Sequence, residues 1–339
     1  MEKAKLIVKN FGPLKDIEIE VRDMVTFIGA QASGKSTLAK LLSIFEDVDF
    51  REEDKASFEE ALKKYSIYSY LNEESSISYI KGTIHFQYQS IQFSEVNEEK
   101  IRWKSSTIHS IFIPTERAFL HLIAENTLGL INNNVQIPKH LLNSGQDYEK
   151  AIQTIKELPL NIIDKNIKYK REGKTSYIYH NETEKIDLLE SASGLQSIIP
   201  ILLLVEYANT LKDNYNFNFV VEEPELNLYP KAQHELISYL IKNCLTERRN
   251  LILTTHSPFI LASLNNLLLA YDKGQSKPKE VAKIIKKESW LNPKKFIAYQ
   301  LKNGKAYKIM DDKLGQIKEN MIDSISNDFS DEFDKLLEV

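Results

Sequence analysis

The chain has 339 residues, of which 42% are hydrophobic and 27% are charged, which is the composition of an ordinary globular protein. Its 44 basic and 48 acidic residues nearly balance, which excludes a surface that is basic throughout but not a local basic patch. The single cysteine, Cys244, excludes an intrachain disulfide framework, and no apolar run approaches the ~20 residues needed to cross a bilayer. We therefore expect a cytoplasmic protein without a membrane partner.

The N-terminal part is predicted to begin with three short strands, because apolar and β-branched residues alternate at 5–9, 16–21 and 24–28. GAQASGKST and a helix, TLAKLLSIF, follow the third strand. Residues 79–104 alternate and turn like a small antiparallel sheet, and 127–160 are predicted to be helical and loop-rich.

A hairpin is predicted to turn at Glu172-Gly173, and a strongly apolar helix follows SASGLQS. Beyond it we expect the strand FNFVV, the helix YPKAQHELISYLIKNCL, the strand NLILTTH, a further helix and the strand NLLLAY at 266–271. Strands that alternate with helices indicate a parallel, doubly wound core.

The C-terminal region divides by charge. Residues 273–308 hold 11 lysines and two glutamates, a balance of +9, whereas 311–339 hold three lysines and nine acids, a balance of −6. Two interpretations stay open: solvated faces that complement each other, or a basic surface for nucleic acid or an acidic partner.

The segment from Gly29 to Ser36 fits the phosphate-binding pattern G-x-x-x-x-G-K-[ST], with a predicted strand before it and a helix after it. In such a loop the backbone N–H groups and the helix N-terminus face phosphate oxygens. Lys35 is expected to reach the β- and γ-phosphates, Ser36 to ligate Mg²⁺ and Thr37 to assist. The nucleotide-binding residues are therefore predicted as Gly29, Gln31, Ala32, Ser33, Gly34, Lys35, Ser36 and Thr37.

Two later strands are predicted to deliver polar side chains to this loop. FNFVV ends in Glu222 and Glu223, and a carboxylate there would hold Mg²⁺ while the next orients the attacking water. LILTTH ends in His256, which is placed to contact the γ-phosphate. We expect Glu222 and Ser36 on the metal side, and Glu223 and His256 as catalytic residues.

The order of P-loop, small-residue signature, EEPE and strand-end histidine resembles the ABC-type ATPases, and most of all their SMC, RecF and OLD-like branch. The NFG turn between two strands ahead of the P-loop is typical of that branch. The resemblance implies an α/β P-loop NTPase fold with a mixed core sheet flanked by helices, a small antiparallel β subdomain and a helical lobe. As one ATPase head, the chain would divide into a core (1–48 and 215–272), an antiparallel sheet (79–104), a helical lobe with the signature (117–212) and C-terminal strands and helix (273–339).

The resemblance also implies a head-to-tail homodimer that sandwiches two ATP molecules with Mg²⁺. Each site would be completed in trans by the partner's signature, here Ser193, Gly194, Leu195 and Gln196, with slow, assembly-dependent turnover. SGLQ departs from the LSGGQ of transporters, Glu222 stands where many relatives have Asp, and Gln31 stands where SMC-like loops have Asn. IFIPTER nominates Glu116 or Arg117 for the Q-loop, although Arg117 could equally be a structural ion-pair partner.

Three functions follow from the resemblance. The first is a stand-alone ATPase switch that controls a separate effector, such as a nuclease, as in the ATPase subunits of the antiphage systems Septu and PARIS. The second is a RecF-like repair ATPase that binds DNA through the hairpin cations (Lys168, Lys170, Arg171 and Lys174) and the lysine-rich 273–308 segment. The third, a transporter's nucleotide-binding subunit, is disfavoured by SGLQ. The 83 residues after His256 contain no D-x-D cluster, so we expect any nuclease to act in trans.

Overall fold

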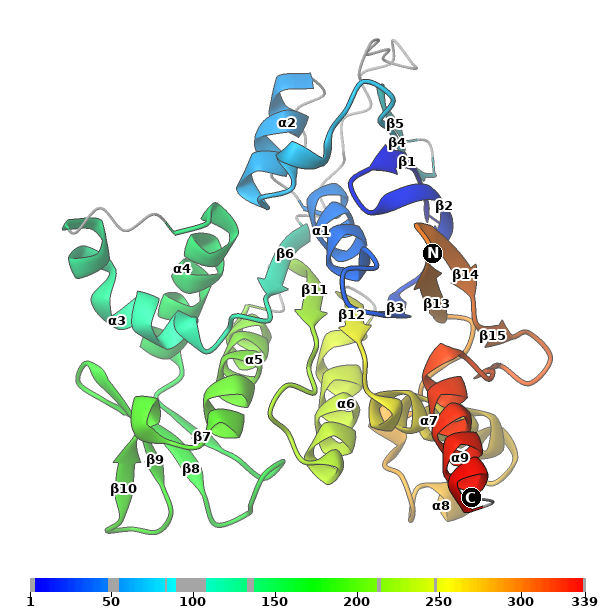
Figure 1. Ribbon diagram of the computed structural model, residues 1–339. Helices are drawn as coiled ribbons and strands as arrows, with labels where there is room; N and C mark the ends of the chain where they lie inside the picture. The colour runs from blue at the N-terminus through cyan, green and yellow to red at the C-terminus, as the bar shows by residue number, and fades with distance from the viewer. Residues whose placement is uncertain are drawn as a thin grey trace.

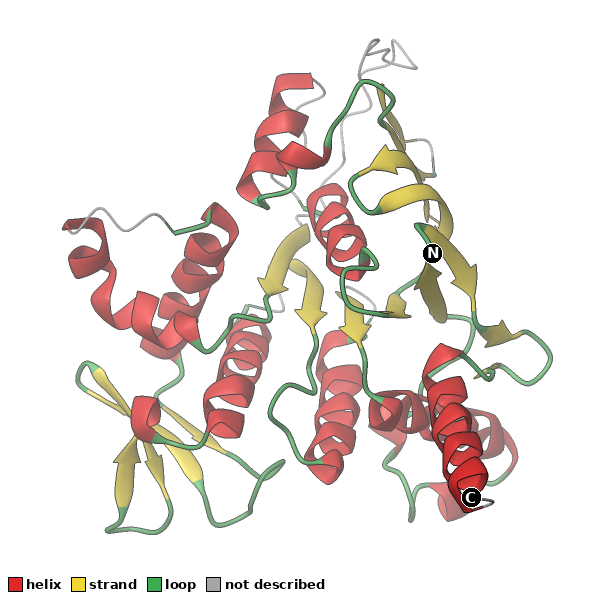
Figure 2. Cartoon of the chain, viewed as in Figure 1, coloured by secondary structure: helices red, strands yellow, loops and turns green. Residues whose placement is uncertain are grey.

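The computed structural model describes residues 4–47, 55–82, 84–89, 108–132, 137–211, 215–246 and 249–337. Its centre is a ten-stranded mixed sheet in the order β5-β4-β1-β2-β14-β13-β3-β12-β11-β6 (Figure 1). A smaller four-stranded sheet lies near the helices α3, α4 and α5 (Figure 2). The structure therefore has the mixed α/β fold expected of a P-loop ATPase.

The parallel half of the large sheet carries the loops that are expected to bind nucleotide. Strands β13, β3, β12, β11 and β6 run parallel to one another, so their carboxyl ends meet along one edge. Their bounds are Phe296–Lys302, Met24–Gly29, Arg249–Thr255, Asn216–Glu222 and Ile108–Ile113. β3 and β11 are buried along nearly their whole length, which explains their continuous apolar sequences.

The other half of the sheet is mostly antiparallel and contains the first two of the three predicted N-terminal strands. It consists of β1 (Ala4–Phe11), β2 (Leu14–Val21), β4 (Ser76–Lys81), β5 (Ile84–Gln89) and β14 (Lys305–Lys308). β4 pairs with β1, so the described part of the predicted 79–104 sheet extends the core sheet; residues 90–107 lie outside the described residues. β13 and β14 lie between β3 and β2, so these C-terminal strands also belong to the core sheet.

Helices α1 (Lys35–Phe45), α5 (Ser193–Thr210) and α6 (Pro230–Cys244) pack against the parallel strands. α7 (Pro258–Ser276) packs on α6, and α3 (Phe119–Asn132) packs on α4 (Lys139–Thr154). The remaining helices are α2 (Lys55–Lys64), α8 (Pro278–Val281), α9 (Met321–Leu337) and three short 3₁₀ turns at Tyr68–Tyr70, Leu188–Glu190 and Lys287–Ser289.

The predicted hairpin at Glu172-Gly173 is confirmed. It lies in the four-stranded sheet of β7 (Glu157–Pro159), β8 (Lys168–Glu172), β9 (Thr175–Tyr179) and β10 (Lys185–Asp187). A last pair, β15 (Met310–Asp311) and β16 (Gln316–Ile317), precedes α9.

The predicted strand at 266–271 is wrong, because these residues lie inside helix α7. The Ser257 hydroxyl accepts hydrogen bonds from the N–H groups of Phe259 and Ile260, and Pro258 occupies the first turn, so the helix starts with strong signals. No proline interrupts the chain until Pro278, and leucine is a good helix former, so the apolar run continues the helix.

Candidate nucleotide site

The P-loop connects the end of β3 to the start of α1. Gly34 has φ +101°, and an added Cβ would come within 2.4 Å of Leu14, so conformation and space both favour glycine here. The buried Lys35 ammonium donates hydrogen bonds to the carbonyl oxygens of Gly29 and Ala30, each at 3.0 Å. Burial lowers the pKa of Lys35, whereas nearby Glu223, Glu225 and Glu222 raise it. The loop therefore holds a buried cation beside three carboxylates.

The other predicted nucleotide-binding residues form a short turn and the first turn of α1. Gln31, Ala32 and Ser36 are exposed, whereas Thr37 is buried. The Ser33 hydroxyl oxygen is buried without a hydrogen-bond partner. An unpaired polar atom in a phosphate-binding pattern fits a loop that hydrogen-bonds a bound anion.

Glu222 ends β11 and is 3% exposed. Burial raises the pKa of its carboxyl group, and this effect exceeds that of the hydrogen bonds from the Ser36 hydroxyl and the Thr115 backbone N–H, which lower the pKa. Its Oε1 atom is buried without a hydrogen-bond partner. A buried carboxylate oxygen with nothing to bind, beside an exposed hydroxyl, is a donor pair suited to Mg²⁺.

Glu223 and His256 meet across neighbouring strand ends. The Glu223 carboxylate lies 3.0 Å from His256 Nε2, and this hydrogen bond is the main cause that lowers the pKa of Glu223. Glu223 has φ +42°, and its N–H donates to the Thr254 carbonyl oxygen at 2.9 Å. The left-handed backbone turns the chain away from the strand direction of β11 immediately after Glu222, which separates the two carboxylates.

Glu225 has a structural contact that sequence reasoning missed. Its carboxylate accepts hydrogen bonds from the Thr255 hydroxyl and the His256 N–H, each at 2.7 Å. Burial raises the pKa of this carboxyl group. Glu225 therefore fixes the end of β12, from which His256 projects; the acid run itself was the only available signal.

Arg117 is fully buried, and its guanidinium donates only to backbone carbonyl oxygens. The acceptors are Pro114 at 3.2 Å, Ser197 at 2.9 Å, and Glu222 and Glu223 at 2.8 Å. Burial lowers its pKa to about 10. Arg117 makes no ion pair within the described residues, so the ion-pair interpretation is wrong. Because its N–H groups already donate to backbone carbonyl oxygens, Arg117 is better suited to stabilising the fold than to a Q-loop contact with nucleotide.

Glu116 differs from Arg117, because it is exposed and its carboxylate accepts a hydrogen bond from the Thr115 hydroxyl at 2.8 Å. Of the two Q-loop candidates, only Glu116 has a side chain open to solvent.

The signature residues begin helix α5 and pack on the loop after β11. A Cβ on Gly194 would meet the Asn227 carbonyl oxygen at 2.7 Å, so glycine permits this close approach. The Gln196 amide donates to the carbonyl oxygens of Leu189 and Ser191, both at 2.9 Å, which turns it toward its own loop. Ser193 is exposed and Leu195 is buried. In Figure 1, α5 and α1 lie on different sides of β11, and within the described residues the hydrogen bonds of the Gln196 side chain go to its own loop and not to the P-loop.

A histidine absent from the sequence predictions supports the signature helix. His121, which is 2% exposed, hydrogen-bonds the Gln196 carbonyl oxygen at 3.0 Å and the Tyr148 hydroxyl at 2.6 Å. Burial lowers its pKa to about 4, so the neutral ring is maintained at neutral pH. Nothing in the local sequence distinguishes His121 from a surface residue.

No group of three His, Cys, Asp or Glu side chains among the described residues forms a metal site on its own. The donor set at Glu222 and Ser36 therefore fits an ion that also binds phosphate oxygens and water, as Mg²⁺ does. Over the same described ranges, no helix is both long and apolar enough to span a membrane.

Comparison with known proteins identifies the family. No curated protein matches the chain in sequence. Similar solved structures include the SMC head domain from Thermotoga maritima (12% identity, 91% of this chain and 98% of that chain, TM-score 0.39). The Smc head bound to the C-winged helix domain of ScpA has 8% identity, coverages of 92% and 99%, and a TM-score of 0.47. An ATP-binding cassette of an ABC transporter in its ADP conformation has 16% identity, coverages of 93% and a TM-score of 0.39.

The family profile described as the AAA ATPase domain matches residues 1–65 and 46–261, which is most of the chain. With the P-loop at the end of β3 and the acid pair at the end of β11, the chain belongs to the AAA ATPase domain family.

Proposed function

We propose that the chain is an ATP-binding and ATP-hydrolysing switch that works as a head-to-tail homodimer and controls a separate effector protein. The observation that carries the proposal is the arrangement after β11. Glu222 presents an unpaired buried oxygen beside Ser36, and the next residue, Glu223, contacts His256 at 3.0 Å. Two adjacent acids with different surroundings can perform different tasks.

On the metal side, Ser36 and Glu222 would hold Mg²⁺, which supplies positive charge to the phosphate groups when it is bound. Lys35 now donates to two loop carbonyls, and rotation of its side chain would bring the ammonium to phosphate oxygens. On the water side, Glu223 has its pKa lowered, so it is ionised at neutral pH and able to orient water and accept its proton. His256 would hold Glu223 in place and contact the γ-phosphate.

The dimer is supported by the position of the signature. Ser193, the first residue of α5, is exposed, and α5 and α1 lie on different sides of β11 in Figure 1, so we propose that a second copy brings the signature to ATP. Hydrolysis would then depend on assembly, as a switch requires.

A separate effector is supported by helix α9. Ile325, Phe329, Phe333 and Leu336 recur every three or four residues, so they share one face, and they are 46%, 67%, 61% and 68% exposed. An exposed apolar stripe of this kind is a common protein contact. We propose a nuclease subunit of a bacterial antiphage defence system as the effector. Co-purification with the product of the adjacent gene, and its loss in Phe329→Asp/Phe333→Asp, tests this step.

The switch itself is tested with Glu223→Gln, which preserves the side-chain shape but removes the proton acceptor. We expect this variant to remain an ATP-bound dimer in size-exclusion chromatography with light scattering, and to hydrolyse ATP at least about 100-fold more slowly. Lys35→Ala is the matched control, because it should lose ATP binding and stay monomeric. A monomer for Glu223→Gln in ATP and Mg²⁺, or tight ATP binding by Lys35→Ala, would contradict the proposal.

A second function, DNA binding by a RecF-like repair ATPase, is favoured by one observation. Seven lysines between α7 and β14 are exposed and have no ion-pair partner within the described residues: Lys279, Lys283, Lys286, Lys287, Lys294, Lys302 and Lys305. The hairpin supports it less, because Lys168, Lys170 and Arg171 pair with Glu157, Glu172 and Glu125.

Salt-dependent binding of duplex DNA decides between the two functions. Each phosphate contact by a lysine adds about one unit to the salt slope, so Lys283→Ala/Lys286→Ala should reduce the slope by about two if DNA binds there. Absence of binding in 50 mM salt would eliminate the second function.

A further inference from the structure

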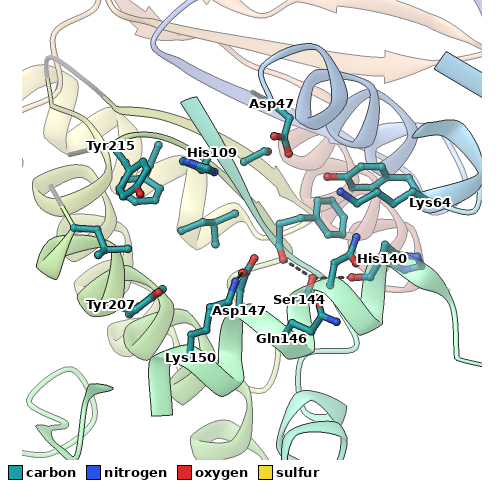
Figure 3. A pocket seen from close by; sticks show the side chains of 17 residues that line it. Asp47, Lys64, His109, His140, Ser144, Gln146, Asp147, Lys150, Tyr207 and Tyr215 are labelled. Carbon is teal, nitrogen blue, oxygen red and sulfur yellow. Dashed lines mark hydrogen bonds and ion pairs between the residues drawn. The ribbon is translucent and has the colours of Figure 1, made fainter. Parts of the chain in front are cut away.

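A cavity of about 530 Å³ lies beside the amino-terminal ends of β6 and β11, at the edge of the sheet opposite the P-loop. Figure 3 shows the side chains that line it. Its walls come from α4, the end of α5 and the amino-terminal parts of β6 and β11. Asp47, just after the end of α1, lines it, whereas Lys35 of the P-loop begins α1. An 11-residue helix is about 16 Å long, so the cavity is separate from the nucleotide site. Its volume suits a small molecule.

Several polar side chains that line this cavity are not hydrogen-bonded within the part of the chain that the structure describes. Within the described ranges, no hydrogen bond or ion pair to another residue is made by the side chains of Lys64, His109, Asn143, Gln146 and Tyr207. They come from α2, β6, α4 and α5. Unused donors and acceptors that converge from four elements on one concave space are the usual property of a small-molecule site.

The two ends of the cavity differ in chemistry. The rings of His109 and Tyr215 pack edge to face at 4.8 Å, and Phe217 lies 6.3 Å from His109. Figure 3 shows His109 and Tyr215 at one end and Lys64 toward the other, with Gln146, Asp147 and Lys150 along α4. A flat heterocycle can stack at the aromatic end, because every base presents a π-face.

The charges restrict the ligand further. Lys150 pairs with Asp147 at 3.2 Å, whereas Lys64 makes no ion pair within the described residues; the lining also contains the carboxylate of Asp47. Lys64 is therefore the lysine placed to bind an anionic group of a ligand. The Ser144 hydroxyl donates to the Phe112 carbonyl oxygen at 2.7 Å and so occupies the outer edge of β6, which disfavours an added peptide strand.

We propose that this cavity is an effector site for a nucleoside monophosphate. The base stacks against His109 and Tyr215, the amides of Asn143 and Gln146 hydrogen-bond the base or the ribose, and Lys64 binds the phosphate. The regulatory part of this proposal rests on the proposed ATPase function, whereas the binding part does not.

The cavity is linked to the nucleotide site by its walls. β6 continues to Pro114 and Arg117, β11 ends at Glu222, and α5 begins with the signature at Ser193. A ligand that shifts α5 or β11 at the cavity end therefore acts on residues at the nucleotide end. Thermodynamic coupling is reciprocal, so ATP changes the affinity for the effector by the same factor as the effector changes the affinity for ATP.

Binding is tested by calorimetry on Lys35→Ala, so that the P-loop does not contribute. The probes are AMP, GMP, CMP and UMP, with adenosine and inorganic phosphate for the two halves of the ligand. We expect at least one monophosphate to bind with a sub-millimolar Kd. Tyr215→Ala should weaken it about ten-fold, and Lys64→Ala should weaken the monophosphate but not the nucleoside.

Gln153→Ala is the matched control: Gln153 is exposed and lies on α4, the helix that carries Asn143 and Gln146, and its loss should leave binding unchanged. Thermal unfolding of each variant verifies that it is folded. If Tyr215→Ala is not folded, Asn143→Ala replaces it as the variant that tests binding. Absence of binding by all four monophosphates at 1 mM, or binding that the cavity variants do not change, overturns the site. Binding of phosphate alone with equal affinity overturns the nucleotide assignment.

Regulation is tested separately with the wild-type chain. We expect the bound monophosphate to change the steady-state ATPase rate at least about three-fold, and Lys64→Ala to remove this change without altering the basal rate. An unchanged rate with proven binding overturns the regulatory part alone. Complete lack of ATPase activity in the wild type instead refutes the proposed function and leaves the binding result standing.

Discussion

Arg117 donates a hydrogen bond from Nη2 to the backbone carbonyl oxygen of Glu223 at 2.8 Å. The same guanidinium binds the carbonyl oxygens of Glu222 and of Ser197, in the first turns of α5. One buried cation therefore joins the start of the signature helix to the backbone that aims the two acids. In a head-to-tail dimer these two parts would serve different ATP molecules, so movement at one would be transmitted to the other.

Arg117→Ala should destabilise the fold and uncouple these parts. It leaves several buried carbonyl oxygens without a donor, and each unsatisfied group costs about 1–3 kcal/mol. We expect the free energy of unfolding in urea to fall by about 3 kcal/mol or more. Arg117→Lys should restore only part of it, because an ammonium cannot reproduce the fork of donors. Arg171→Ala is the control, because the Arg171 guanidinium pairs with Glu125 in the helical lobe, and it should lower the free energy of unfolding by less. Equal decreases for the two variants would refute the role of Arg117 in joining α5 to the end of β11.

His256→Ala should raise the pKa of Glu223, because the hydrogen bond from His256 is the main cause that lowers it and burial opposes this. A carboxyl group with a lowered folded pKa stabilises the protein above its unfolded pKa of 4.5, and this stabilisation disappears as pH falls through the folded pKa. The difference in unfolding free energy between wild type and variant should therefore be present at pH 7 and shrink below about pH 4.5. A difference that is constant with pH would contradict this, and His234→Ala controls for loss of a histidine.

Gly194→Ala tests the contact between the signature and the loop after β11. Alanine would stabilise the helix by about 1 kcal/mol relative to glycine. Its Cβ, however, would lie 2.7 Å from the Asn227 carbonyl oxygen, so close that the backbone there would have to shift. We expect the clash to dominate and the ATPase rate to fall at least about ten-fold at any protein concentration. Ser193→Ala, in the same turn but exposed, should leave the fold intact. A stabilised, fully active Gly194→Ala would show that the contact has no role.

Glu225 should tolerate Gln better than Ala. Glu225→Ala leaves the Thr255 hydroxyl and the His256 N–H without their acceptor, at a cost of about 1–3 kcal/mol for each group. Glu225→Gln keeps one acceptor oxygen and removes a charge that burial disfavours. Chemical unfolding should therefore rank wild type and Gln above Ala. If Ala were as stable as Gln, the carboxylate would not be what fixes the end of β12.

Local patterns were sufficient wherever a short segment carries its own signal. The glycine loop between a strand and a helix, the apolar FVV run into acids and the hairpin at Gly173 were all predicted, because their conformations depend on neighbouring residues. The same reasoning failed at 266–271, where a leucine-rich run has no local property that separates a buried strand from a buried helix. The helix start at Ser257-Pro258, upstream of the run, makes these residues part of a helix.

The P-loop, the adjacent acids at the end of β11 and the histidine at the end of β12 could be located from the amino-acid sequence alone. Three relationships became visible in the folded chain: strands from both ends of the chain share one sheet, Glu225 supports His256, and Arg117 binds carbonyl oxygens rather than a carboxylate. These relationships join residues far apart in the chain, and the Tyr299 hydroxyl, for example, donates a hydrogen bond to the carbonyl oxygen of Glu20, 279 positions away. A buried donor takes whichever acceptor the assembled fold leaves unpaired, and no local pattern records that choice.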